Sequence, residues 1–211
     1  MIKTGSDILD SLIGSYKNEI TLIYGPAASG KTTLAKLAAI AQAKEGKKIL
    51  FIDAEHGFSI ERFNQLGGQG LLDCILILQP KDFQEQAKII ERLPKMLSNK
   101  FSLVIIDTIG VFYRLELNKG IYLANKMMDE QLQILDKISK NIPVLLTNQV
   151  YSKINGGIST VTAIGGDIVK SKSRCILELI KEPRTILLRK PAQKEIRFEI
   201  EEKGFLQPNN P

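Results

Sequence analysis

A glycine-rich run near the amino terminus has the residue types and spacing that bind phosphate groups. It matches the pattern G-x-x-x-x-G-K-[ST] in full, with an apolar run before it and a helical period after it. Its glycines allow backbone N–H groups to converge on phosphate oxygens, and the helix directs its positive end to the same anion. We therefore expect ATP with Mg²⁺ on Gly25, Pro26, Ala27, Ala28, Ser29, Gly30, Lys31 and Thr32.

Specific roles follow from this pattern. Lys31 is expected to reach the β- and γ-phosphates, the Thr32 hydroxyl to bind Mg²⁺, and Thr33 to donate to the α-phosphate. Asp107 ends the apolar run S-L-V-I-I-D, which is where a carboxylate can hold Mg²⁺ through water. We predict a nucleotide and metal site that joins the loop to this strand end.

Two further polar side chains follow apolar runs. Glu55 comes two residues after the run that ends at Asp53, and we expect it to polarise the attacking water; the alternative is a solvated turn carboxylate. Gln149 follows another such run and can sense the γ-phosphate, unless it is a strand-end amide that bonds only to backbone. The single histidine, His56, is given no catalytic role.

The elements that position these residues alternate between two periods. Short apolar runs predict strands at 19–24, 48–53, 75–78, 102–107 and 144–148, and helical periods predict helices at 31–44, 82–97 and 121–140. Nearly continuous apolar strands with helices between them indicate a parallel sheet that is covered on both faces.

The character of the chain changes after residue 150. Residues 151–162 are rich in Ser, Gly, Thr and Asn, and we expect them to form a mobile loop. Three short runs at 175–180, 185–188 and 197–201 predict antiparallel strands at one edge of the sheet. No repeat or linker is evident, so residues 1–211 are expected to form one α/β domain.

Composition limits the classes of function. The chain is 44% hydrophobic and 25% charged, and its net charge of +6 fits a polyanionic partner such as nucleic acid. No apolar run approaches the ~18–20 residues of a membrane span, and no signal peptide is evident. Cys74 and Cys175 each lie in an apolar run, so we expect reduced core thiols in a cytoplasmic protein.

An ordered set of motifs resembles the RecA/RadA recombinase family. Residues 4–14, T-G-S-D-I-L-D-S-L-I-G, resemble the family's T-G-S-x-x-L-D-x-L-L-G-G opening. Residues 51–62, F-I-D-A-E-H-G-F-S-I-E-R, are similar to Y-I-D-T-E-G-T-F-R-P-E-R. Further likenesses are Y-R-L-E for F-R-x-E, L-T-N-Q-V for V-T-N-Q-V, I-G-G-D-I-V for P-I-G-G-x-I-V, and E-E-K-G for T-E-K-G. The chain is identified as a member of that family over nearly its whole length.

The resemblance implies a RecA-like P-loop ATPase core and assigns further residues. It implies that Glu55 activates water, that Gln149 couples the γ-phosphate to a DNA-binding loop, and that Arg62 packs on the adenine ring. It places two DNA loops at about 115–120 and 151–162. The candidate DNA contacts are Arg114, Lys119, Tyr151 and Lys153, whose alternative is exposed loop residues without a ligand.

Departures from the family pattern lower the expected activity. The core begins at residue 4, so the family's N-terminal helical DNA-binding domain and polymerisation plug are expected to be absent. Its D-S-P-x-L-P-E-G-E segment is replaced by residues 190–195, K-P-A-Q-K-E. We therefore expect slow ATP hydrolysis without independent strand exchange and no long filament, and the sequence leaves a dimer open.

The resulting hypothesis is an accessory protein of recombination and DNA repair that assists the RadA recombinase on single-stranded or branched DNA. The resemblance also suggests a link to a Holliday-junction resolvase. One alternative is a KaiC-like signalling ATPase that acts on proteins, which normally has a Glu pair after the second strand and lacks T-N-Q-V. The other is a DNA-binding scaffold whose nucleotide is structural.

Overall fold

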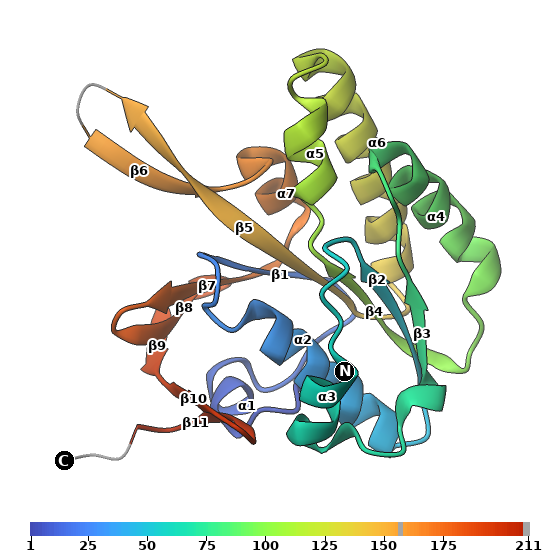
Figure 1. Cartoon of the computed structure of the whole chain (residues 1–211), viewed down its shortest axis with the longest axis vertical. Helices are drawn as coiled ribbons and strands as arrows, with labels where there is room; N and C mark the ends of the chain where they lie inside the picture. Colours follow the sequence, from blue (N-terminus) through green and yellow to red (C-terminus); the bar gives the residue numbers. More distant parts are fainter. Residues whose placement is uncertain (156–157, 209–211) are drawn as a thin grey trace.

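The computed structural model of the chain describes residues 1–155 and 158–208, with side chains outside 151–163, and a nine-stranded sheet lies at the centre of these ranges. The strand order is β3-β2-β4-β5-β1-β7-β8-β9, and β6 pairs with β5 outside this path (Figure 1). Strands β3 to β7 along this order are parallel, and β8 and β9 are antiparallel. The bounds are β1 Ile20–Gly25, β2 Lys48–Asp53, β3 Ile75–Leu78, β4 Phe101–Asp107, β5 Val144–Asn155, β6 Ile158–Ala163, β7 Cys175–Lys181, β8 Arg184–Lys190 and β9 Lys194–Arg197.

Helices cover both faces of the sheet and divide the core into two clusters. One face packs against α1 and α2, and the other against α4, α6 and α7 (Figure 1). Central strand residues such as Leu22, Phe51 and Ile106 are fully buried. Burial of each such side chain stabilises the fold by about 1.5–3 kcal/mol. The helix bounds are α1 Asp7–Ile13, α2 Lys31–Lys44, α3 Ile60–Phe63, α4 Phe83–Met96, α5 Val111–Glu116, α6 Ile121–Ser139 and α7 Gly166–Lys172, with short turns at Asn64–Gly68 and Leu72–Cys74.

The predicted fold class is confirmed. The five predicted strands and three predicted helices are all present, and most of their ends agree within one residue. Helices α1, α5 and α7 are short and carry no long helical period, so the sequence pattern did not indicate them. Among the described residues, no helix combines the length and apolar character needed to cross a bilayer.

The prediction of a loop at 151–162 is wrong. Strand β5 continues to Asn155 and pairs with β6, in a register that runs from Val150 opposite Ala163 to Asn155 opposite Ile158. Strand β6, I-S-T-V-T-A, is rich in β-branched residues, which favour strands, and its pairing extends β5 beyond the predicted strand end. A Gly-Gly pair between two strand segments is a hairpin signal.

The C-terminal run at 197–201 also differs from the prediction. It is not one strand, because β9 ends at Arg197 and a separate two-stranded sheet follows, with β10 Glu199–Glu201 and β11 Gly204–Leu206. Phe198 lies between them, is fully buried, and stacks on Phe205 with ring centroids 4.4 Å apart. Burial of this aromatic pair takes the chain away from the sheet edge and across α1 and α2 (Figure 1).

Candidate nucleotide site

The predicted site residues meet at the carboxyl ends of four neighbouring strands. Strand β1 leads into the phosphate loop, and its last residue, Gly25, lies opposite Gln149 of β5. Strands β2 and β4 end side by side, with Asp53 opposite Asp107. Because parallel strands end at the same edge, side chains far apart in sequence are brought together there, next to the first turn of α2.

The phosphate loop has a backbone that its glycines make possible. Gly30 has a φ of 107°, and a Cβ there would lie 2.6 Å from the Phe205 ring and 2.8 Å from Ile200 Cδ1. A Cβ on Gly25 would lie 2.5 Å from the carbonyl oxygen of Leu179. Both positions therefore exclude a side chain, because the loop backbone packs closely against β7 and the C-terminal hairpin of β10 and β11.

Lys31 begins α2 and turns back over the loop. Its Nζ donates to the carbonyl oxygens of Gly25 at 3.0 Å and Pro26 at 2.8 Å. Burial lowers the pKa of the Lys31 ammonium, whereas the carboxylates of Asp107 and Glu55 act in the opposite sense. A phosphate in this loop would supply the missing negative charge close to the buried ammonium.

Asp107 is a buried carboxylate that faces the same loop. The hydroxyl of Thr147 donates a hydrogen bond to it. Burial raises the pKa of Asp107, whereas the hydroxyls of Thr147 and Thr32 act in the opposite sense. A carboxylate and a hydroxyl side by side are oxygen donors that suit Mg²⁺, and the buried carboxylate would gain a compensating charge.

The phosphate loop also contains a buried polar atom with which a nucleotide could form a hydrogen bond. The Ser29 hydroxyl is buried and has no hydrogen-bond partner in the described part of the chain. A hollow of about 300 Å³ continues outward from the loop and is lined by Ala28, Gly30, Lys31, Thr32, Thr33, Arg62, Arg184 and Ile200. The residues present therefore fit a triphosphate with its magnesium ion.

Glu55 and Gln149 are joined directly. The Oε1 atom of Glu55 accepts hydrogen bonds from Gln149 Nε2 at 2.8 Å and from Thr108 Oγ1 at 3.0 Å. Glu55 follows β2, Thr108 follows β4, and Gln149 lies within β5, so three strands contribute to this contact. It brings the predicted water-activating carboxylate to the strand that continues into the β5–β6 hairpin.

Arg62 lies at the rim of the 300 Å³ hollow and contacts the C-terminal hairpin. Its Nη1 and Nη2 donate to the carbonyl oxygens of Glu202 and Glu201, at 2.9 Å each. Nη1 also donates to Gln65 Oε1 at 3.1 Å. The planar guanidinium is thus oriented by hydrogen bonds in its own plane.

Several residues that build the site had no local signal in the sequence. Asp53 accepts the backbone N–H groups of Gly57 and Phe58, so it shapes the loop that carries Glu55. The nearly fully buried Lys36 donates to the Ser59 carbonyl oxygen at 3.4 Å and lies 5.0 Å from the Phe58 ring centroid. Only tertiary structure reveals these supports.

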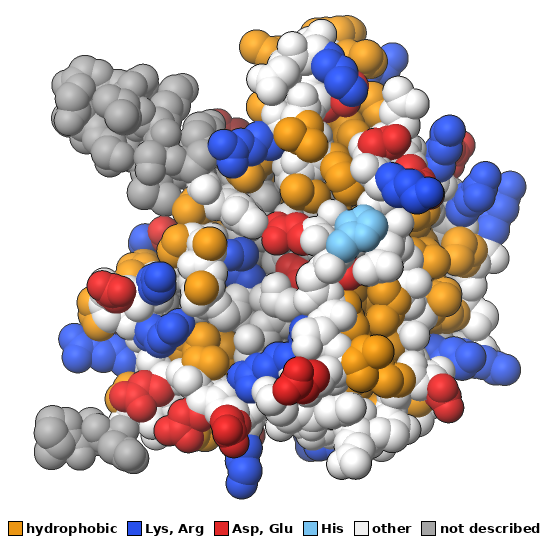
Figure 2. All heavy atoms as spheres, viewed as in Figure 1, with side chains coloured by type: hydrophobic (Ala, Val, Ile, Leu, Met, Phe, Trp, Pro, Cys, Tyr) orange, Lys and Arg blue, Asp and Glu red, His pale blue; other side chains and the backbone are white. Residues whose placement is uncertain are grey.

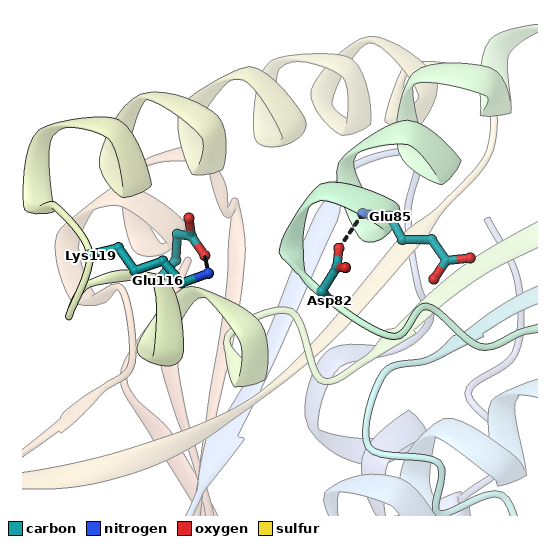
Figure 3. Close-up of polar contacts among 4 residues, drawn as sticks. All are labelled: Asp82, Glu85, Glu116 and Lys119. Carbon is teal, nitrogen blue, oxygen red and sulfur yellow. Dashed lines mark hydrogen bonds and ion pairs between the residues drawn. The ribbon is translucent and has the colours of Figure 1, made fainter.

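Two of the four candidate DNA residues, Arg114 and Lys119, lie where α5 meets α6, whereas Tyr151 and Lys153 belong to β5. Arg114 is exposed on α5, and Lys119 Nζ forms an ion pair with Glu116 Oε2 at 3.0 Å (Figure 3). Figure 3 also shows Asp82, which caps the neighbouring helix α4 through the Glu85 N–H. The side chains of Tyr151 and Lys153 lie outside the described residues.

Several exposed apolar side chains lie close to Lys119 in the sequence at the α5–α6 corner. Hydrophobic side chains gather at the top of the molecule in Figure 2, over the α5–α6 corner that Figure 1 labels. The large exposed ones are Leu115, Ile121, Tyr122 and Leu123. Four such residues within nine positions exceed the scattered exposure that is normal for a soluble surface.

Comparisons with known proteins agree with this geometry. A profile of the Rad51 family matches residues 1–207. The DNA repair and recombination protein RadB of Methanoculleus marisnigri is 34% identical, over 97% of this chain and 96% of the relative. RadB of Methanocaldococcus jannaschii is 37% identical over 90% and 93%, respectively. A crystal structure of the RadB recombinase has a TM-score of 0.80 and 33% identity, over 99% of this chain and 100% of that chain.

These likenesses extend over the sheet, the phosphate loop and the C-terminal strands, so the fold is RecA-like. The chain therefore belongs to the Rad51 family and is a relative of the RadB proteins of DNA repair and recombination.

Proposed function

We propose that this chain is an ATP- and DNA-binding accessory protein of homologous recombination, with a slow DNA-linked ATPase that assists the RadA recombinase. The observation that carries the proposal is the contact of Glu55 with Gln149. It joins the carboxylate that would face the γ-phosphate to the strand that leads into the hairpin. The names of the RadB relatives support a place in recombination and repair.

Hydrolysis would use the residues at the carboxyl edge of the sheet. Glu55 holds the attacking water and accepts its proton, while Lys31 and the loop N–H groups stabilise the charge that develops on the phosphates. Thr32 and Asp107 would hold Mg²⁺, which supplies charge neutralisation when it is bound. Thr33 contacts the α-phosphate, and Arg62 packs on the base.

DNA would be sensed through the other end of the same contact. When Glu55 turns to the water, the amide of Gln149 loses its acceptor and β5 gains a second arrangement. The hairpin and the α5–α6 corner, with Arg114, Lys119, Tyr151 and Lys153, would contact the phosphate backbone of single-stranded or branched DNA. Gln149 thereby couples the γ-phosphate to DNA.

The accessory role rests on family membership and on the departures of residues 190–195 from the family pattern. In this proposal residues 1–211 act as one cytoplasmic domain, as a monomer or dimer that forms no long filament. Its partners are RadA and, through branched DNA, a Holliday-junction resolvase. A KaiC-like signalling role has less support, because the Rad51 profile matches residues 1–207.

RadA loading on single-stranded DNA tests the proposal. We expect the wild-type chain with ATP to raise the rate or extent of loading, measured by fluorescence of labelled DNA. The Lys31→Ala variant should lose ATP binding by about 100-fold or more and fail to stimulate, because the buried ammonium is its phosphate contact. A folded wild-type protein that binds ATP but leaves RadA loading unchanged would contradict the accessory role.

A further inference from the structure

The C-terminal hairpin β10–β11 packs against the phosphate loop although it lies about 170 residues further along the chain. Ile200 pairs with Phe205 across the hairpin, and both side chains contact the space where a Gly30 Cβ would be. Phe205 stacks on Phe198, so the hairpin is anchored in the core through buried aromatic rings. The contact with the loop is therefore a fixed part of the fold.

The hairpin also sets the orientation of Arg62. Both terminal nitrogens of the guanidinium donate to hairpin carbonyl oxygens, at 2.9 Å to Glu201 and 2.9 Å to Glu202. Two bonds from one planar group fix the plane of that group. They use its in-plane N–H groups, so the faces of the guanidinium remain for contact with a flat ligand.

Ile200 lies on the same hollow as Arg62. The hollow of about 300 Å³ runs from Thr32 and Thr33 at the start of α2 to these two side chains. A nucleoside triphosphate whose phosphates lie in the loop would have this hollow available for its base. A nucleobase has two apolar faces, and the hollow offers a hydrocarbon wall and a guanidinium face.

We propose that the C-terminal hairpin is a working part of the nucleotide site: it supplies Ile200 as the apolar wall for the base and holds Arg62 in position against the base. This inference rests on the proposed nucleotide site and adds a specificity-determining residue and a positioning element to it. The hairpin contributes to the affinity for the base and leaves the affinity for the phosphates to the loop.

Affinities for ATP and for inorganic tripolyphosphate, each with Mg²⁺, separate the two contributions. We expect Ile200→Ala and Arg62→Ala each to weaken ATP binding by about tenfold and tripolyphosphate binding by less than about twofold. The double variant should lose less than the product of the two single effects, because both side chains hold one base. Ile200→Val, which keeps most of the wall, should restore ATP affinity.

Leu206→Ala is the matched control, since Leu206 lies in the same hairpin and its side chain is 41% exposed. It should change neither affinity. If Ile200→Ala weakens the binding of ATP and of tripolyphosphate by the same factor, the hairpin only packs against the loop and the inference is overturned. Lys31→Ala should lose both ligands; if it keeps them, the nucleotide site itself is wrong, which is a separate result.

Discussion

The carboxyl edge of the sheet and the α5–α6 corner differ in how their functional side chains are held. At the edge, Lys31 and Asp107 are only 6% and 5% exposed, and their polar atoms bond to neighbouring strands. At the corner, Ile121 and Tyr122 are 67% and 82% exposed. Lys119 bonds there to a residue of the preceding helix.

The difference suggests two kinds of task. Phosphate chemistry needs atoms fixed within fractions of an ångström, and strand ends in a parallel sheet provide that precision. A partner of variable shape, such as single-stranded DNA, needs charge and apolar surface without a fixed arrangement. In this reading the edge performs the chemistry and the corner recognises the partner.

The strongest test of the edge is the Glu55→Gln variant. The amide oxygen still accepts from Thr108 and Gln149 but cannot take a proton, so single-turnover hydrolysis should slow by about 100-fold with ATP affinity within about twofold. Glu61→Gln is the control, because Glu61 is exposed on α3 nearby. Equal rates for wild type and Glu55→Gln would remove the catalytic role of Glu55.

A smaller effect is expected for Asp107→Asn on stability without nucleotide. Burial raises the pKa of Asp107 above its ordinary 3.8, so the folded state binds a proton here more readily than the unfolded state does. The free energy of unfolding therefore falls as pH rises from the unfolded pKa through the folded pKa. The variant should be about 1 kcal/mol more stable near pH 7, and the gain should shrink towards about pH 4.

Urea denaturation at both pH values measures this gain. Exposed Asp73→Asn provides the control and should show no pH-dependent difference of this kind. A less stable Asp107→Asn near neutral pH would mean that the edge is optimised for stability and not for a cation, which would break the contrast between the two regions.

The smallest effect should come from the corner. The double variant Arg114→Ala, Lys119→Ala should weaken single-stranded DNA binding by about threefold. The slope of log affinity against log salt concentration should become smaller in magnitude by about one for each cation removed. Lys88→Ala with Lys95→Ala, on the exposed side of α4, removes the same charge elsewhere. If both pairs change the slope equally, DNA binding follows overall charge and the corner has no special part.

Local patterns in the sequence account for much of the edge. Apolar runs predicted the strands, and the phosphate loop and Asp107 follow such runs at fixed spacing, so their placement depends on few long-range contacts. The sequence and the family resemblance assigned Glu55 and Gln149 separate roles at the γ-phosphate and predicted no contact between them. The bond itself, and its third member Thr108, became evident only in three dimensions.

Features made by distant segments were not predictable in this way. The bonds from Arg62 to Glu201 and Glu202 join residues about 140 positions apart, and no periodicity encodes them. The split of the last strand at Phe198 follows from burial of an aromatic pair, and not from local propensity. Strand β6 was not predictable from composition, because its β-branched residues lie within a stretch that is rich in Ser, Gly and Asn.

The length of β5 has a mechanical consequence. Its first half lies between β1 and β4, and the six residues from Val150 to Asn155 leave that sheet and, among the described strands, pair with β6 alone. At a rise of ~3.3 Å per residue this arm projects ~20 Å. Gln149 lies at the fulcrum, so a tilt of only ~5° there would displace the far end by ~2 Å. The β5–β6 arm therefore begins at the residue that lies beside the phosphate loop, and the held half of β5 lies on the other side of that residue.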